Sequence, residues 1–402
     1  MSAPRIRRRA RPKRARAVTA RYTPYARQSI GKDDIAAVVE VLRSDWLTTG
    51  PKIEEFEKAV AQYTGAPYAV ALTNGTAALH AAMYAAGIGP GDEVIVPAMT
   101  FAATANAVVF QGGTPVFADV DPETLLLDPK QVEAKITSRT RAIVPVDYAG
   151  QPCDYDALQG LADEHSLRLI ADSAHALGGA YKGRRVGTLA DLTTLSFHPA
   201  KQITTGEGGM VTTSNPQFAE AMIRFRNHGI TSDHRSRAKQ GTWFYEMVDL
   251  GFNYRITDIQ CALGLSQLRK LPKWLLRRRA IARRYGQAFG RLDAIRPLRV
   301  SPNVKHAYHL YVIRLALEQL KGDRTTVFSM LRERGFGVNV HYIPVHLHPF
   351  YRKRFGTGPG LCPVAEDAYE RILSLPMYGS LSGTEVDHVI VAMKEVLQDL
   401  AT

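Results

Sequence analysis

The sequence of 402 residues predicts an α/β protein, with a mostly parallel sheet covered by helices on both faces and a smaller C-terminal domain. Short apolar runs alternate with segments of helical periodicity, which is the pattern of parallel strands joined by crossover helices. After Leu263 this alternation gives way to a long, basic helical pattern that includes residues 269–289. The chain is also longer than one simple core usually requires, which favours a large and a small domain.

The strands expected in the first half of the chain are residues 68–72, 93–97, 115–120, 141–146, 168–172 and 191–197. Helical patterns follow three of them, at about 76–86, 101–110 and 155–165. We place the large domain at 21–265 and the small domain, with its linking helix, at 266–402. Ligands of such sheets bind at the carboxyl ends of the strands, so polar side chains at those ends are the first candidates for a site.

The net charge of +13 is concentrated at the N-terminus, where the first 16 residues contain eight Lys or Arg and no acid. The rest of the chain therefore carries only about +5, which is not the charge of a nucleic-acid-binding body. We predict that residues 1–20 form a basic disordered tail, because like charges and prolines cannot bury a core. Binding of nucleic acid or an anionic surface is the alternative for this segment alone.

The cysteines and the apolar stretches indicate a cytoplasmic protein. Cys153, Cys261 and Cys362 are far apart and have neither metal-ligand nor disulfide spacing, so we expect reduced thiols and no metal site. No apolar segment of a signal peptide follows the N-terminal arginines. Two stretches without charge, 66–91 and 94–118, are interrupted by polar residues, glycines and prolines. They are therefore expected to be buried strands and helices rather than membrane spans.

Three predicted strands end in residues that suit an anionic, aromatic cofactor. Asn74, Gly75 and Thr76 begin a helix, where free N–H groups and the helix dipole attract anions. Asp172 ends a second strand, and Ser196 ends a third. Each feature alone is as well explained by an ordinary helix cap or a solvated polar residue, so only their combination predicts a site.

Lys201 completes the combination, because it lies in a turn rich in threonine and glycine, SFHPAKQITTGEGGMVTT (196–213). A lysine amine can form a Schiff base with the aldehyde of pyridoxal 5′-phosphate, and a carboxylate can keep the pyridine nitrogen protonated. An anion cradle, a strand-end acid and such a lysine are what this cofactor requires. We therefore predict a pyridoxal phosphate enzyme.

The segments DSAHALGG (172–179), SFHPAKQITTGEGGMVTT and LGFNYRITDIQCALGLSQL (250–268) resemble the DegT/DnrJ/EryC1/StrS sugar aminotransferase family. The resemblance extends from about Tyr25 to the C-terminus. It implies the fold type I architecture of pyridoxal phosphate enzymes, with a seven-stranded sheet and a small C-terminal α/β domain. Related dehydratases have a histidine at the position of Lys201, so the lysine favours transamination.

The resemblance also implies the roles of individual residues. Lys201 would be the Schiff-base lysine, Asp172 the partner of the pyridine nitrogen, and His175 a neighbour of the phenolic oxygen. The remaining cofactor contacts would come from Thr76, Ala77, Ser196, Phe101 and, across a homodimer with shared active sites, Asn253 of the other subunit. The residues considered for substrate binding are Arg255, His341, Tyr342 and Tyr351, and packing roles are equally open for them.

Within the family, HYIPVHLHPFYR (341–352) and YEMVDLGFNYRITD (245–258) are most similar to enzymes of the pseudaminic acid pathway. The implied reaction moves an amino group from L-glutamate to C4 of a UDP-linked 4-keto-6-deoxy-N-acetyl hexosamine. A UDP-4-keto-pentose or another nucleotide keto sugar is the alternative substrate. A ligand-binding regulator whose basic tail binds DNA and an interaction protein without chemistry are the alternatives from other classes. Lys201 and Asp172 favour the enzyme, because a binding module needs neither.

Overall fold

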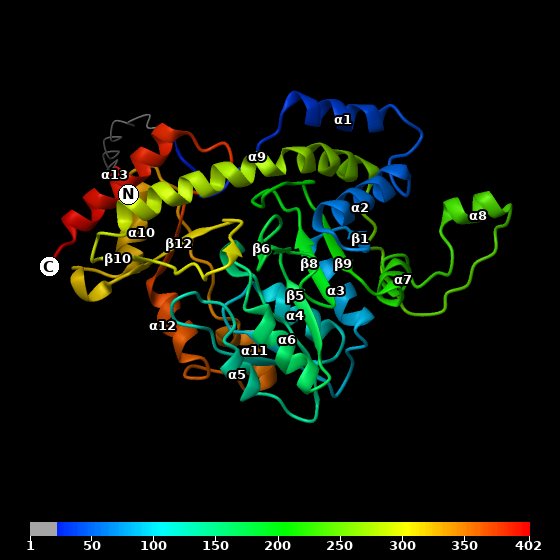
Figure 1. The fold of residues 1–402 in the computed structure, drawn as a ribbon, viewed down its shortest axis with the longest axis horizontal. Helices are drawn as coiled ribbons and strands as arrows, with labels where there is room; N and C mark the ends of the chain where they lie inside the picture. The colour runs from blue at the N-terminus through cyan, green and yellow to red at the C-terminus, as the bar shows by residue number, and fades with distance from the viewer. Residues whose placement is uncertain (1–21) are drawn as a thin grey trace, which may run out of the picture.

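The computed structural model describes residues 22–402, so the predicted basic tail lies outside the described residues. The main sheet has seven strands in the order β1-β9-β8-β5-β4-β2-β3 (Figure 1). Its strands are β1 (Tyr68–Leu72), β2 (Glu93–Pro97), β3 (Thr114–Ala118), β4 (Thr140–Ile143), β5 (Arg168–Asp172), β8 (Leu192–Ser196) and β9 (Gly209–Thr213). All neighbouring pairs are parallel except those of β9, which runs antiparallel to β1 and β8. The predicted mostly parallel, seven-stranded sheet is confirmed.

Helices cover this sheet, and together they enclose one large apolar core. α3 packs on β8 and β9, α6 packs on β4 and β5, and α2 packs on β1. The helices in this part of the chain are α1 (Lys32–Leu42), α2 (Pro51–Thr64), α3 (Gly75–Ala85), α4 (Ala102–Phe110), α5 (Pro129–Glu133), α6 (Tyr155–Glu164), α7 (Pro216–Phe225) and α8 (His234–Gln240). Strands β1, β2, β4 and β8 are buried along most of their length, as expected for strands covered on both faces.

A second core is built around a three-stranded antiparallel sheet in the C-terminal part of the chain. Its strands are β10 (Ile295–Pro297), β12 (Tyr311–Leu315) and β13 (Ile372–Leu375), and helices α10 (Arg324–Glu333) and α13 (Gly383–Asp399) contribute to its core. Helices α11 (Pro349–Phe355) and α12 (Pro363–Arg371) instead contribute to the large core. A short three-stranded sheet joins β11 (Val304–Lys305) to β6 (Ala180–Tyr181) and β7 (Arg184–Arg185).

The long helix α9 (Asp258–Phe289) connects the two cores, running from the side of α1 and α2 to the side of α10 and α13 (Figure 1). It begins before the basic segment identified in the sequence, because Thr257 and Gln260 form a capping box. Thr257 Oγ1 accepts a hydrogen bond from the Gln260 amide at 3.2 Å. The helix therefore crosses the limit expected between residues 265 and 266, and the division into two domains stays a proposal in which α9 belongs to both.

Two further observations concern the cysteines and the membrane. Cys153, Cys261 and Cys362 are free thiols, and all three are buried. Among residues 22–402, no helix is long and apolar enough to cross a bilayer.

Candidate active site

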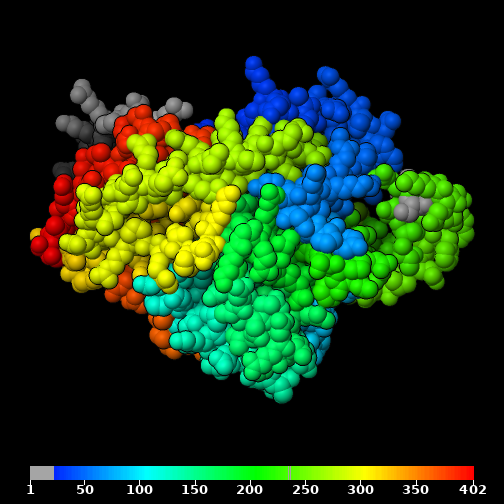
Figure 2. Space-filling view, viewed as in Figure 1, coloured from blue at the N-terminus to red at the C-terminus, as the bar shows by residue number. Residues whose placement is uncertain are grey.

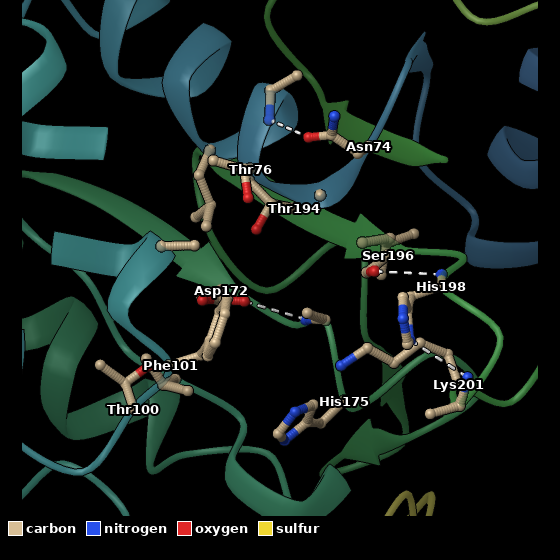
Figure 3. Close-up of a pocket in the computed structure, with 18 of the residues that line it drawn as sticks. Asn74, Thr76, Thr100, Phe101, Asp172, His175, Thr194, Ser196, His198 and Lys201 are labelled. Carbon is tan, nitrogen blue, oxygen red and sulfur yellow. Dashed lines mark hydrogen bonds between the residues drawn. The ribbon is translucent and has the colours of Figure 1, made fainter. Parts of the chain in front are cut away.

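A cavity of about 780 Å³ opens at the carboxyl ends of β5 and β8. Its wall combines the N-terminus of α3, the ends of both strands, the turn that carries Lys201, and segments from the C-terminal part of the chain. In Figure 3, Asn74, Thr76 and Ser196 lie along one side of the cavity, and Lys201 extends toward Asp172 and His175. The sheet topology thus brings together residues that the sequence separates by more than a hundred positions.

The first turn of α3 is arranged as an anion cradle. Asn74 is the N-cap, and its Oδ1 accepts a hydrogen bond from the Ala77 amide at 2.8 Å. Gly75 allows β8 to approach, because a Cβ at this position would lie 3.1 Å from Cβ of Ser196. Thr76 and Ala77 line the cavity beside Ser196. Backbone N–H groups and two hydroxyls therefore converge where the helix dipole favours a phosphate.

Asp172 is the buried acid of the site, with 6% of its surface exposed. Its Oδ2 accepts a hydrogen bond from Thr104 Oγ1 at 2.7 Å, and its Oδ1 accepts one from the Ala174 amide at 3.2 Å. Burial raises the pKa of the carboxyl above its usual range, while these hydrogen bonds and the charge of Lys201 act in the opposite direction. A cation bound against this carboxylate would therefore stabilise its ionised form.

Lys201 is partly buried in the turn after β8, and its amide donates a hydrogen bond to the carbonyl of His198 at 2.9 Å. The turn closes because the Thr205 amide reaches the Phe197 carbonyl, at 3.0 Å, and Gly206 adopts a left-handed conformation with φ of 82°. Burial lowers the pKa of the Lys201 amine to about 8, although Asp172 partly opposes the shift. Near neutral pH, a larger fraction of the Lys201 amine is therefore neutral and nucleophilic than in an ordinary lysine.

His175 and Tyr342 also line the cavity. Tyr342 OH lies 3.0 Å from His175 Nε2, and the His309 ring centroid is 4.3 Å from that of His175. Burial lowers the pKa of His175 well below its usual range, so the imidazole is neutral at neutral pH. Phe101 is 59% exposed and lines the cavity 5.8 Å from the Tyr342 ring, so its face is available to stack on a planar ligand.

The structure does not bring all the predicted residues to this cavity. Asn253 is exposed and lies outside the cavity wall, paired through its backbone with Asn227. Arg255 donates to Asn227 Oδ1 at 2.8 Å and lines a separate cavity of about 360 Å³. His341 and Tyr351 are buried: His341 Nδ1 pairs with Ser374 Oγ at 2.8 Å, and Tyr351 donates to Asn106 at 2.6 Å. Neither of these two side chains lines the cavity.

Several wall residues were not identified from the sequence. Thr104, which donates to Asp172 but does not line the cavity, was also not identified, although it follows Phe101 by three positions and so returns to the same side of α4. The unidentified wall residues near strand ends are Thr194, which lies in β8, and His198 and Glu207, which lie in the turn of Lys201. Tyr25, Tyr254 and His309 come from segments distant from β5 and β8 and carried no signal of this kind.

The fold is that of an aminotransferase. The profile of the DegT/DnrJ/EryC1/StrS aminotransferase family matches residues 28–394, and the protein belongs to this family. It is 42% identical over 379 residues to the spore coat polysaccharide biosynthesis protein SpsC of Bacillus subtilis, and the match covers 94% of this chain and 97% of SpsC.

Solved structures show the same relationship. Spr1654 from Streptococcus pneumoniae, described as a sugar aminotransferase, has been solved in a PLP-form and a PMP-form. Its PLP-form matches with a TM-score of 0.89 and 35% identity, covering 95% of this chain and all of that one. PseC from Helicobacter pylori, described as an aminotransferase in the biosynthesis of pseudoaminic acid, matches with a TM-score of 0.88 and 33% identity, covering 94% of this chain and all of PseC.

Proposed function

We propose that the protein is an aminotransferase that moves an amino group from L-glutamate to C4 of a UDP-linked 4-keto-6-deoxy-N-acetyl hexosamine. Its activity would be that of a UDP-4-amino-4,6-dideoxy-N-acetyl-beta-L-altrosamine transaminase, the enzyme type of the pseudaminic acid pathway. The observation that carries transamination is the Lys201 amine, whose pKa is about 8, inside a cavity that also contains the buried carboxylate of Asp172. The relationship to PseC supports the choice of sugar.

The cofactor is pyridoxal 5′-phosphate, and the residues of the cavity fit it. The first turn of α3 and Ser196 suit its phosphate, because Gly75 leaves room for the close approach of the strand end. When bound, the cofactor supplies an aldehyde that carries the amino group and a ring that accepts electrons. In this proposal Phe101 would stack on that ring, and Asp172 and His175 would contact its polar edge.

Lys201 has two proposed tasks, both of which need a neutral amine. Its Nζ would hold the cofactor covalently, and as a free amine it would take the proton from the α-carbon of glutamate. Burial favours the neutral amine, as the lowered pKa indicates. Asp172 has the complementary task, because a buried carboxylate without a cation is unfavourable and therefore attracts a protonated ring nitrogen.

We propose that Tyr342 contacts the substrate within one chain and that Arg255 contacts it only across a subunit interface. Tyr342 lines the cavity, and its hydroxyl is within hydrogen-bond distance of His175. Arg255 lies outside this cavity, so a contact with the sugar diphosphate would require a neighbouring subunit. His341 and Tyr351 act as buried supports of the segment that carries Tyr342, and we do not include them among the residues that contact substrate.

A substrate panel tests the proposed reaction. Purified protein with pyridoxal phosphate should convert glutamate and the UDP-4-keto-6-deoxy-N-acetyl hexosamine to the amino sugar and equimolar 2-oxoglutarate, both identified by mass. The panel includes a UDP-4-keto-pentose and a keto sugar carried by a different nucleotide. Preference for either of these would replace the proposed substrate but keep transamination. No amine transfer to any keto sugar would contradict the function itself.

We also propose a homodimer in which each active site contains Asn253 of the other subunit. The segment between α7 and α9, which contains α8, projects from the rest of the molecule (Figures 1 and 2). Its apolar side chains are unusually exposed, including Trp243 at 84% and Leu250 at 71%. Such a surface favours burial against a partner, and a second copy of this chain is the partner that would also place Asn253 in a cavity.

A complementation experiment distinguishes shared from separate sites. Lys201→Ala and an inactivating, folded Asn253 variant should each be nearly inactive, yet regain activity when their subunits exchange. A mixed dimer would have one site with both defects and one with neither. Random exchange makes about half the dimers mixed, so roughly a quarter of wild-type activity should return. Proven mixed dimers without recovered activity would show that both residues act within one chain.

A further inference from the structure

Arg278 is an arginine in the middle of α9 that is almost completely buried, with 2% of its surface exposed. Within residues 22–402, no carboxylate forms an ion pair with it. Burial lowers the pKa of its guanidinium to about 10, which still leaves it charged at neutral pH. Removing an unpaired charge from water is costly, and an apolar side chain would fill the same space at a lower cost. The position therefore requires a specific reason for an arginine.

The hydrogen-bond partners of Arg278 are all backbone carbonyls, and they come from three separate segments. Its Nη2 donates to the carbonyl of Lys201 at 3.3 Å. Its Nη1 lies 3.0 Å from the carbonyl of Tyr308, 3.2 Å from that of His309 and 3.0 Å from that of Met377. One side chain thus joins the turn of Lys201 to two segments of the C-terminal part of the chain. His309, in one of those segments, lines the cavity itself.

The arginine fork suits this arrangement better than any other side chain. A planar guanidinium presents several N–H groups in fixed directions, whereas a lysine amine is a compact point charge. Hydrogen bonds from a charged donor are stronger than neutral ones, and they compensate for part of the lost solvation. The carbonyl of Lys201 belongs to the residue whose amine must be placed beside Asp172, so a shift of this backbone would move Nζ.

We propose that Arg278 is a positioning residue for Lys201: its guanidinium fixes the backbone of the lysine turn against the segments that carry His309 and Met377. The proposal rests on the proposed function for the catalytic importance of Lys201, but not for the contact itself.

Arg279, the next residue of the same helix, provides a matched control. It is partly buried and also donates to carbonyls, to His306 at 3.0 Å and to Gly178 at 3.2 Å, but it does not contact the lysine turn. The test compares wild type, Arg278→Met and Arg279→Met as full-length proteins, with and without pyridoxal phosphate. Hydrogen exchange read by mass spectrometry reports on the backbone of residues 198–206.

We expect Arg278→Met to speed exchange in residues 198–206 by about tenfold, the effect of losing one charge-assisted hydrogen bond, while Arg279→Met leaves that segment unchanged. With cofactor bound, Arg278→Met should also lower kcat without raising KM for glutamate. Arg278→Lys keeps a charge and one donor, so it should fall between wild type and Arg278→Met. If Arg278→Met does not fold, the hydrogen exchange of residues 198–206 is measured in Arg278→Lys instead.

Equal exchange of residues 198–206 in wild type and the Arg278 variants would overturn the proposal, and so would an equal effect of Arg279→Met. Faster exchange throughout the protein, with no excess in this segment, would assign Arg278 to general stability and overturn it as well. The exchange measured without cofactor does not depend on any reaction. An inactive wild-type protein would therefore contradict the proposed function, but the hydrogen-exchange test of Arg278 would still be valid.

Discussion

Lys201→Ala should abolish transamination, lowering turnover by roughly a thousandfold or more, because the substitution removes both the covalent attachment of the cofactor and the group that moves the proton. The protein should still fold and retain some cofactor, since the phosphate cradle at α3 is unchanged. The readouts are single-turnover rates, the absorbance of bound cofactor and circular dichroism. Borohydride reduction of the wild-type protein should add the mass of the cofactor to the peptide that contains Lys201.

Two variants control this experiment. Lys201→Arg keeps a positive charge but cannot form the covalent bond, so it should be as inactive as the alanine variant. Lys58→Ala removes an exposed lysine, whose surface ion pair with Glu54 contributes little, and should leave turnover unchanged. A folded Lys201→Ala protein with near-normal turnover would refute the assignment of the lysine, and with it the proposed reaction.

The main features of the fold could be predicted from sequence because they depend on local patterns. Apolar runs of five to seven residues, with helical periods after three of them, identified six of the seven strands and helices α3, α4 and α6. β9 was not predicted, because it follows directly on the glycine-rich turn of Lys201 and is the one antiparallel strand. The start of α9 depended on a capping box that lies before the basic segment. The second difference concerns an element limit, which local composition marks only weakly.

From the residue pattern alone, the site could be predicted only at strand ends, whereas Phe101, His175 and Tyr342 were implied by the family resemblance. Asp172 and Ser196 end β5 and β8, and Lys201 follows β8, so the topology of a parallel sheet places them together. His309 reaches the cavity through tertiary packing, which no sequence spacing encodes. Arg278 is a clearer example, since in sequence it is one of three consecutive arginines and only the structure shows that it is buried.

Asn253 and Arg255 lie outside the cavity of a single chain, and their proposed roles depend on a second subunit.

Asp172→Asn should keep the fold and much of the cofactor affinity but lower kcat by about a hundredfold or more, because a neutral amide cannot stabilise a protonated ring nitrogen. An amide has nearly the shape of the carboxylate and can still accept the hydrogen bond of Thr104, so the loss would report on charge. Steady-state kinetics and the absorbance of the bound cofactor measure the effect.

Thr104→Val tests whether the loss in Asp172→Asn comes from the missing negative charge or from a changed orientation of the side chain. It removes the 2.7 Å hydrogen bond to Asp172 Oδ2 while leaving the negative charge in place. A net hydrogen bond is worth about 1 kcal/mol, so we expect a loss of roughly five- to tenfold in kcat, well below that of Asp172→Asn. If Thr104→Val were as damaging as Asp172→Asn, the orientation of the carboxylate would matter more than its charge. If Asp172→Asn retained full turnover with cofactor bound, the ring nitrogen would need no anionic partner here, and Asp172 would be left with a packing role at the end of β5.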